Sequence, residues 1–213
     1  MIQLFLEIPI DMIELHRSIV IAISPIVIII GICATIKTRK NYECNQKRSK
    51  ITSTLCLLYH DGFVAIASYS AWFSTWPFFD EASFYEMHLF FFTLGASIGF
   101  ASIIIYVMYL FKIESVPRAL GFTPDKLITD GIFRKSRNPQ SLARNIGLIS
   151  LGLCGRSFYS LLLAIFWIVI NHFYILNEEK FLEIIFGDNY LGYCSFTPRY
   201  CGILTSLKKS RIV

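Results

Sequence analysis

The residues best suited to chemistry in this chain lie between positions 129 and 199. Arg137, Asn138 and Pro139 precede two apolar helical runs, and the acidic pair Glu178 and Glu179 follows them. A carboxylate only accepts hydrogen bonds, so it suits a ligand that carries hydroxyl or amino groups. Polar groups at both ends of an apolar hairpin predict a site at the surface of a membrane.

The acidic pair has two interpretations on sequence alone. Glu178 and Glu179 form the solvated face of a helix that continues to about residue 185, or they bind the ribose hydroxyls or the amino group of a cofactor. Acidic side chains near a helix C-terminus gain nothing from the helix dipole. This argues against a purely structural role only if the helix ends near the pair.

The segment 117–141 precedes the hairpin and contains the turn residues Pro117, Gly121, Pro124, Gly131 and Pro139. It also carries basic residues near the headgroups, namely Lys126, Arg134, Lys135 and Arg137. Such a loop is attracted to anionic lipid by about 1 kcal/mol per basic residue. Alternatively, its backbone donors cradle an adenosyl cofactor, with Asp125 or another carboxylate on the ribose.

A second polar feature, His60 followed by Asp61, interrupts an apolar run. Ionisable residues at this depth are costly and indicate function by default. Either Asp61 makes a buried contact with His60, His172 or Asn171, or it lines the cavity where the headgroup or thiol end of a lipidic acceptor enters.

The composition explains where these residues must sit. The chain has 213 residues, of which 16% are charged, against about 25% in soluble domains, and its mean hydropathy is +0.55. Its net charge is +5, but the basic residues stand in short loops beside apolar blocks, which argues against a nucleic-acid partner. The six cysteines form no CxxC pair, so we expect no disulfide framework and no metal site.

Apolar blocks of about 20 residues are long enough to cross a bilayer. The expected fold is therefore an all-α membrane bundle of about five transmembrane helices, ending in a helical hairpin with a cytosolic cofactor pocket. The expected spans are about Ser18 to Ile36, Ile51 to Phe73, Met87 to Phe111, Leu142 to Cys154 and Phe158 to Leu176. The fourth is short for a full crossing, and residues 1–16 allow a short interfacial helix.

Loop charges predict the orientation. Residues 37–50 contain six Lys or Arg and one acidic residue, whereas residues 76–86 contain three acidic residues and no Lys or Arg. Residues 112–137 are basic again. The positive-inside rule then places the N-terminus outside and the C-terminus in the cytosol. We expect one integrated domain, with three spans in residues 1–116 and a catalytic core in residues 117–213.

The C-terminal 80 or so residues resemble the isoprenylcysteine carboxyl methyltransferase and phospholipid methyltransferase family. The family's motifs read Leu-Val-Thr-x-Gly-x-Tyr, Arg-His-Pro-x-Tyr, then a hydrophobic hairpin, Glu-Glu, Phe-Gly-x-x-Tyr and Pro-Arg. The matching residues here are Leu127 to Phe133, Arg137 to Pro139, Glu178, Glu179, Phe186, Gly187, Tyr190, Tyr193, Pro198 and Arg199.

This resemblance implies an integral membrane methyltransferase that uses S-adenosylmethionine at its cytosolic face. It places cofactor binding on Asp125, Lys126, Leu127, Ile128, Phe133, Arg137, Asn138, Pro139, Gln140, Ser141 and Glu178. Tyr174 falls where the prenylcysteine enzymes have a substrate-contacting arginine, and Asp61 is the second expected substrate contact. Asn138 replaces the family's histidine, and Ser141 replaces an aromatic wall of the cofactor pocket.

The acceptor implied is lipidic and arrives from the bilayer: an isoprenylcysteine carboxylate, a lipid amine or a similar lipophile. Because Tyr174 removes the cation that would face a carboxylate, an amine or a lipid headgroup ranks first and a prenylated cysteine second. The alternatives are a membrane NADPH-dependent reductase of related core and a non-enzymatic or degenerate membrane protein. Sterol reductases have about ten spans, which argues against the first.

Overall fold

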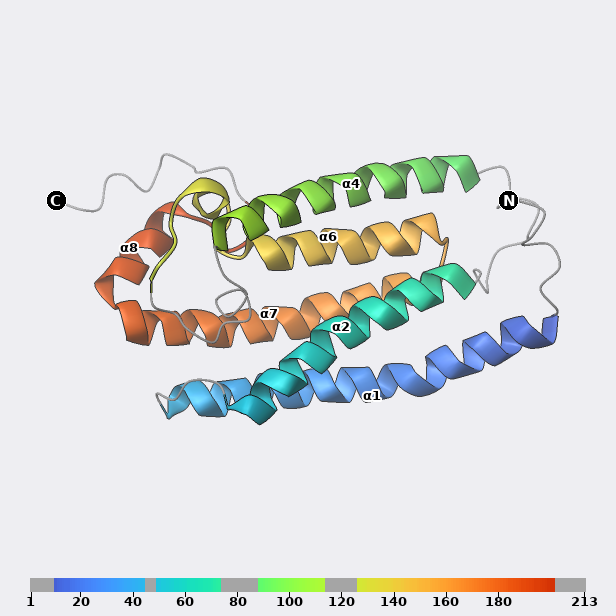
Figure 1. The fold of residues 1–213 in the computed structure, drawn as a ribbon, viewed down its shortest axis with the longest axis horizontal. Helices are drawn as coiled ribbons and strands as arrows, with labels where there is room; N and C mark the ends of the chain where they lie inside the picture. Colours follow the sequence, from blue (N-terminus) through green and yellow to red (C-terminus); the bar gives the residue numbers. More distant parts are fainter. Residues whose placement is uncertain (1–9, 45–48, 74–87, 114–125, 202–213) are drawn as a thin grey trace.

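A computed structural model describes residues 10–44, 49–73, 88–113 and 126–201. Within these ranges the chain is helical and contains no strand. The elements are α1 (Ile10–Glu43), α2 (Lys50–Phe73), α4 (His88–Ile113), the 3-10 helix η2 (Gly131–Arg134), α6 (Pro139–Cys154), α7 (Phe158–Phe186) and α8 (Asp188–Phe196). Figure 1 shows the long helices side by side, so the expected all-α bundle is confirmed.

Four of the helices, α1, α2, α4 and α7, are long and apolar enough to cross a membrane. The fifth, α6, has 16 residues, or about 24 Å, which is shorter than the ~30 Å hydrocarbon core. The expectation of a short first hairpin arm is therefore confirmed.

Two helices extend well beyond the expected spans. α1 continues to Glu43 and α7 to Phe186, which makes them about 51 and 43 Å long at 1.5 Å per residue. Their last turns project past an apolar layer of ~30 Å, and they do so at the same end of the bundle (Figure 1). These extensions build walls of the site described below.

The start of α1 differs from the expected separate interfacial helix in residues 1–16. Residues 1–9 lie outside the described residues, and from Ile10 the chain is already part of α1. The helix continues through Pro25 without a break.

Aromatic packing holds the centre of the bundle. Tyr59 of α2 stacks on Trp167 of α7 at a ring-centroid distance of 4.8 Å, and Phe63 lies edge-on to the same indole. All three are fully buried. The close approach of Tyr59 to α1 requires Gly31, because a Cβ there would meet the ring at 2.5 Å.

Small residues let α4 and α6 approach closely, as membrane helices often do. The hydroxyl of Ser150 donates to the carbonyl of Gly95 at 2.8 Å, and that of Ser102 donates to the carbonyl of Ala143 at 2.7 Å. Each bond fixes one helix against the backbone of the other. The rotation of α6 about its axis is thereby set.

The turn between α6 and α7 closes the hairpin at the end opposite the long extensions. Ser157 caps α7 by accepting a hydrogen bond from the amide of Ser160 at 3.1 Å. Gly155 lies against α2, where a Cβ would meet the carbonyl oxygen of Ala71 at 2.0 Å. Only glycine fits this approach, so the hairpin is seated on α2.

Candidate functional site

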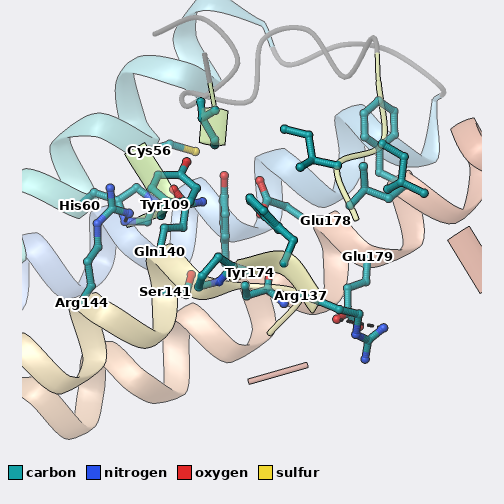
Figure 2. Close-up of a pocket in the computed structure, with 18 of the residues that line it drawn as sticks. Cys56, His60, Tyr109, Arg137, Gln140, Ser141, Arg144, Tyr174, Glu178 and Glu179 are labelled. Atoms are coloured by element: carbon teal, nitrogen blue, oxygen red, sulfur yellow. Dashed lines mark hydrogen bonds and ion pairs between the residues drawn. The ribbon is translucent and has the colours of Figure 1, made fainter. Parts of the chain in front are cut away.

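A cavity of about 430 Å³ opens at the end of the bundle where α4 ends and α6 begins. Its walls come from α1, α2, α4, α6, α7 and α8, and from the segment that leads into α6. Figure 2 shows side chains from these elements converging on one space. The cavity therefore joins segments that are far apart in the sequence.

The structure brings the sequence-predicted residues together around this cavity. It is lined by Lys126, Leu127, Ile128, Phe133, Arg137, Asn138, Pro139, Gln140, Ser141 and Glu178, and by Asp61 and Tyr174. Asp125 lies outside the described residues. The geometry thus supports a common site, while the role of each residue stays a prediction.

The segment before α6 is anchored to the end of α4. Lys112 forms an ion pair and hydrogen bond with Asp130, and this contact lowers the pKa of the Asp130 carboxyl. Gly131 follows with a φ of 60° and packs on the Lys112 side chain, a conformation that favours glycine. The buried Ile132 in η2 completes the anchor, so Leu127 to Phe133 are held at the mouth of the cavity.

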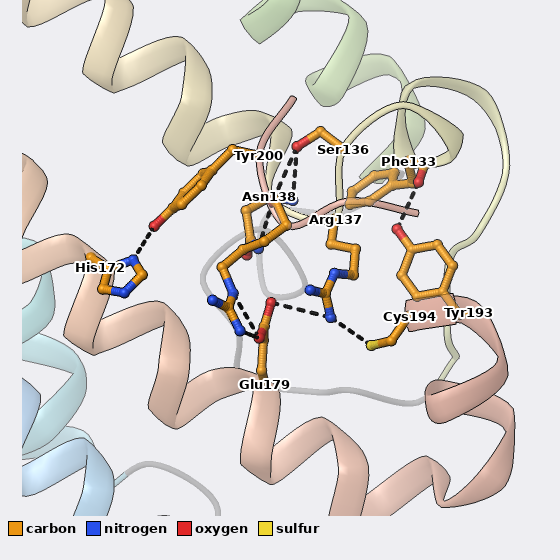
Figure 3. Close-up of polar contacts among 10 residues, drawn as sticks. Phe133, Ser136, Arg137, Asn138, His172, Glu179, Tyr193, Cys194 and Tyr200 are labelled. Carbon is orange, nitrogen blue, oxygen red and sulfur yellow. Dashed lines mark hydrogen bonds and ion pairs between the residues drawn. The ribbon is translucent and has the colours of Figure 1, made fainter. Parts of the chain in front are cut away.

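Glu179 is the centre of an ion-pair network. Its carboxylate accepts hydrogen bonds from Nε and Nη2 of Arg199 at 2.9 and 2.7 Å, and Arg137 lies 3.4 Å from its other oxygen. The Glu179 residue is only 9% exposed. Figure 3 shows both guanidinium groups directed at this carboxylate. The ion pair between Arg199 and the buried Glu179 joins the segment after α8 to α7, and Arg137 adds a second cation to the same carboxylate.

Arg137 was expected to contact a cofactor, but its side chain mainly contacts other residues of the protein. Besides Glu179, its Nη1 donates to the Sγ of Cys194 at 2.6 Å, and its backbone N–H donates to the carbonyl of Pro198 at 2.9 Å. The residue borders the cavity, but its contacts fit a role in positioning the loop. Its effect on a ligand would act mainly through the shape of the site.

Asn138 also binds the C-terminal segment. Its side-chain amide donates to the carbonyl of Arg199 at 3.2 Å, and its backbone N–H donates to the Ser136 hydroxyl at 3.1 Å. In this chain Asn138 therefore joins the start of α6 to the residues after α8 (Figure 3).

The short helix α8 closes the site from the side. The Tyr193 hydroxyl donates to the carbonyl of Phe133 at 2.7 Å. Burial raises the pKa of Tyr193, and burial together with the charge of Glu179 raises the pKa of Tyr190. Both phenols are protonated at neutral pH, and the protonated Tyr193 can donate its hydrogen bond to Phe133.

Glu178 and Glu179 both border the cavity, but the Glu179 carboxylate is paired with Arg137 and Arg199. Successive residues of a helix point about 100° apart, so the two carboxylates have different surroundings. Tyr174, one turn earlier, also lines the cavity, and Figure 2 shows both side chains directed into it. Glu178 is the carboxylate best placed to accept hydrogen bonds from a bound ligand.

Asp61 lies on the cavity wall formed by α2 and is exposed. The predicted buried contacts with His172 and Asn171 are wrong. His172 is hydrogen-bonded to the hydroxyl of Tyr200 at 2.9 Å, and the fully buried Asn171 amide has no hydrogen-bond partner among the described residues. The cavity interpretation of Asp61 is the one that the geometry supports.

Sequence reasoning missed Arg144, which lines the cavity from α6. One of its guanidinium nitrogens lies 3.4 Å from Nδ1 of His60 on α2. A lone charge inside an apolar run was the available signal. Glu179 was considered only as part of the acidic pair, and its ion pairs with Arg137 and Arg199 were not predicted. Other cavity residues with no prior signal are Tyr42 and Phe181, whose rings stack at a centroid distance of 3.9 Å.

Comparison with known proteins gives one family. Residues 90–189 match the model of the family described as phospholipid methyltransferase. No curated protein and no solved structure matches the chain. The matched segment runs from α4 to the start of α8 and contains most of the cavity-lining residues. With its helical hairpin and its Glu178–Glu179 pair in place, this part of the chain is similar to the phospholipid methyltransferase family.

Proposed function

We propose that this protein is an integral membrane methyltransferase that takes its methyl group from S-adenosylmethionine and acts on a lipidic or membrane-delivered acceptor. The observation that carries the proposal is the convergence of Glu178, Phe133 and the start of α6 on one cavity. The family match supports methyl transfer in a membrane setting. The cofactor and the acceptor are inferred from the site.

The cavity suits a nucleoside-bearing cofactor. Its volume of about 430 Å³ lies within the range of about 300–1,000 Å³ that small-molecule pockets span. Glu178 offers an acceptor-only group for ribose hydroxyls or an amino group, and Gln140 offers both a donor and an acceptor. Phe133, Leu127 and Ile128 supply apolar residues in the cavity wall for the adenosyl part.

S-adenosylmethionine supplies a methyl group bound to a positively charged sulfur. The acceptor bonds to the methyl carbon in line with the carbon–sulfur bond, and the sulfur leaves as a neutral thioether. The protein's task is then to orient the two reactants and exclude water. A carboxylate acceptor needs no base, and an amine acceptor needs only to lose its proton. The described residues around the cavity are consistent with this positioning role: Tyr174 and Glu178 define one wall, and Tyr190 and Tyr193 of α8 define another.

A lipidic acceptor has a route into the site. The cavity reaches Leu57 and Asp61 on α2 and Tyr106 on α4, which belong to helices long enough to cross the membrane. The neighbouring surfaces of α2 and α4 are rich in exposed apolar side chains that suit contact with lipid. We infer that the acceptor enters laterally and that the soluble donor enters past the segment 126–138.

The orientation proposed from loop charge places this donor entrance in the cytosol. Lys40 near the end of α1, Lys50 at the start of α2 and Lys112 at the end of α4 lie at the cavity end of the bundle (Figure 1). Basic residues flanking spans on one side favour the cytosolic face. The N-terminus is then outside, and the C-terminus is in the cytosol.

Calorimetric titration of the detergent-purified protein tests the proposal. We expect S-adenosylmethionine to bind with one site per chain and NADPH to give no saturable heat. Membranes that contain the protein should transfer tritiated methyl groups from S-adenosylmethionine to an acceptor. Saturable NADPH binding without S-adenosylmethionine binding would indicate a reductase, and binding of neither would remove the enzyme function.

A further inference from the structure

Arg144 is a cation inside the cavity that the methyl transfer described above does not use. Arg144 is the sixth residue of α6. At 1.5 Å per residue it lies about 7 Å along the helix axis from Pro139. The residue is half-buried and lines the cavity. A guanidinium at this depth of a membrane protein marks a functional site by default.

The charge of Arg144 has no counter-ion in the part of the chain that the structure describes. The ion pairs there join Arg39 to Glu43, Lys112 to Asp130, and Arg137 and Arg199 to Glu179. Asp61 lines the same cavity but forms no ion pair with Arg144. A half-buried cation that borders the cavity and has no ion-pair partner among the described residues is available to an anionic ligand.

Most of the hydrogen-bonding capacity of Arg144 is also unused among these residues. A guanidinium has five N–H donors in a planar fork, and the one hydrogen bond found for it is the 3.4 Å contact to Nδ1 of His60. His60 is itself fixed by rings on α7: its centroid lies 5.1 Å from that of Trp167 and 5.6 Å from that of Tyr174. Nδ1 accepts from Arg144, which holds the fork in place.

We propose that Arg144, positioned by His60, binds the anionic group of the lipid that enters the cavity, a phosphate or a carboxylate. Such groups match the planar fork with two parallel hydrogen bonds. This inference rests on the proposed function, since it assigns the recognition of the acceptor within the same cavity. Arg144 determines specificity, and the methyl-accepting atom lies elsewhere on the same molecule.

The position of Arg144 favours the acceptor over the donor. Figure 2 separates Arg144 and His60 from Glu178 and Glu179, with Gln140, Ser141 and Tyr174 between them. The segment 126–138 that would receive the donor lies on the Glu178 side. Arg144 instead meets α2 at His60, next to Asp61 on the wall that faces the bilayer.

This arrangement changes the argument drawn from Tyr174. On sequence alone, tyrosine in place of an arginine removes the cation for an anionic acceptor. The tertiary structure supplies a cation from α6, and the rings of His60 and Tyr174 lie edge to face at 5.6 Å between them. An acceptor that carries a negative charge, such as a lipid phosphate headgroup, therefore fits the cavity.

The test measures the binding of single-chain amphiphiles to the intact protein in maltoside micelles, using dodecyl phosphate, dodecanoate and dodecylammonium as probes. The wild type should bind an anionic probe at least about tenfold more tightly than dodecylammonium, as expected for charge-assisted hydrogen bonds. The stronger of the two anionic probes distinguishes phosphate from carboxylate. Arg144→Gln should abolish this preference, and Arg144→Lys should retain part of it.

Arg134→Gln is the matched control, because Arg134 is an exposed cation near the same end of the bundle that does not line the cavity. It should leave the preference intact. S-adenosylmethionine affinity, measured on each variant, shows that the variant is folded and should be unchanged by Arg144→Gln. An equal loss of S-adenosylmethionine binding in Arg144→Gln would assign the arginine to the donor and overturn the proposal.

Two further outcomes separate this inference from the proposed function. A wild type that does not discriminate between the anionic and cationic probes, yet binds S-adenosylmethionine, would overturn the anion subsite and leave the methyltransferase function standing. A wild type that prefers the anion through Arg144 but binds no S-adenosylmethionine would support the subsite and remove the methyltransferase function.

Discussion

Arg199 donates two hydrogen bonds to a single carboxylate oxygen of Glu179, at 2.9 and 2.7 Å. The bonds join Arg199, three residues beyond the end of α8, to a buried side chain of α7 that lies 20 positions earlier in the chain. The carbonyl of Arg199 also accepts a hydrogen bond from the Asn138 amide. Arg199 therefore links α7 to the start of α6 on the side of the cavity where the methyl donor is proposed to bind. The wall of the site thus depends on Glu179, whereas Glu178 is the residue proposed to bind the cofactor.

Replacing Glu179 should destabilise the protein. In Glu179→Ala the guanidinium groups of Arg137 and Arg199 lose their shared anion, and breaking a buried pair in this way typically costs about 3–5 kcal/mol. Because Arg199 is partly exposed, we expect the lower end of that range. Thermal unfolding in detergent, followed by circular dichroism, measures the effect. Glu183→Ala, on an exposed face of the same helix, should unfold like the wild type; equal melting temperatures for the two variants would contradict a structural role.

Replacing Glu178 should act on binding instead. Glu178→Ala removes charge-assisted hydrogen bonds to the cofactor, each worth about 1.5–3 kcal/mol, so affinity for S-adenosylmethionine should fall tenfold or more. Calorimetry on Glu178→Ala, with Glu183→Ala as the control, makes the comparison. The melting temperature should change far less than in Glu179→Ala. Unchanged affinity would remove Glu178 from the site.

The proposed topology is tested by cysteine labelling in intact cells. In an otherwise Cys-free variant, single cysteines at positions 45 and 205 should react with a membrane-impermeant maleimide only after the cells are opened. The reason is the alternation of basic and acidic connections along the chain. Ready labelling of either position from outside would reverse the orientation, and with it the cytosolic donor entrance.

The acceptor class is tested with tritiated S-adenosylmethionine in membranes that contain the protein. We expect the label in the lipid fraction, because a lipid headgroup offers both an anion for Arg144 and an atom that accepts the methyl group. The Arg144→Gln membranes provide the control and should incorporate less label. Base-labile label on a farnesylcysteine analogue, with none in the lipid fraction, would instead favour a prenylated cysteine.

The sequence by itself determined the helices and part of the set of residues around the cavity. Long apolar runs have few alternatives to helices when backbone groups must be satisfied without water, so four of the five spans begin within a few residues of the expected positions. The first begins earlier, at Ile10. The segment from Leu127 to Ser141 forms a local motif, and its resemblance to the family predicted one site shared with Glu178.

The tertiary structure decided which side chains meet. Arg144 and His60 are 84 positions apart, and no spacing in the sequence predicts that α6 turns its arginine towards α2. That rotation is set by contacts such as Ser150 with Gly95 and Ser102 with Ala143. The different surroundings of Glu178 and Glu179 have the same origin. One step along a helix rotates a side chain by about 100°, and the packing of α7 decides which of the two neighbours meets Arg137 and Arg199.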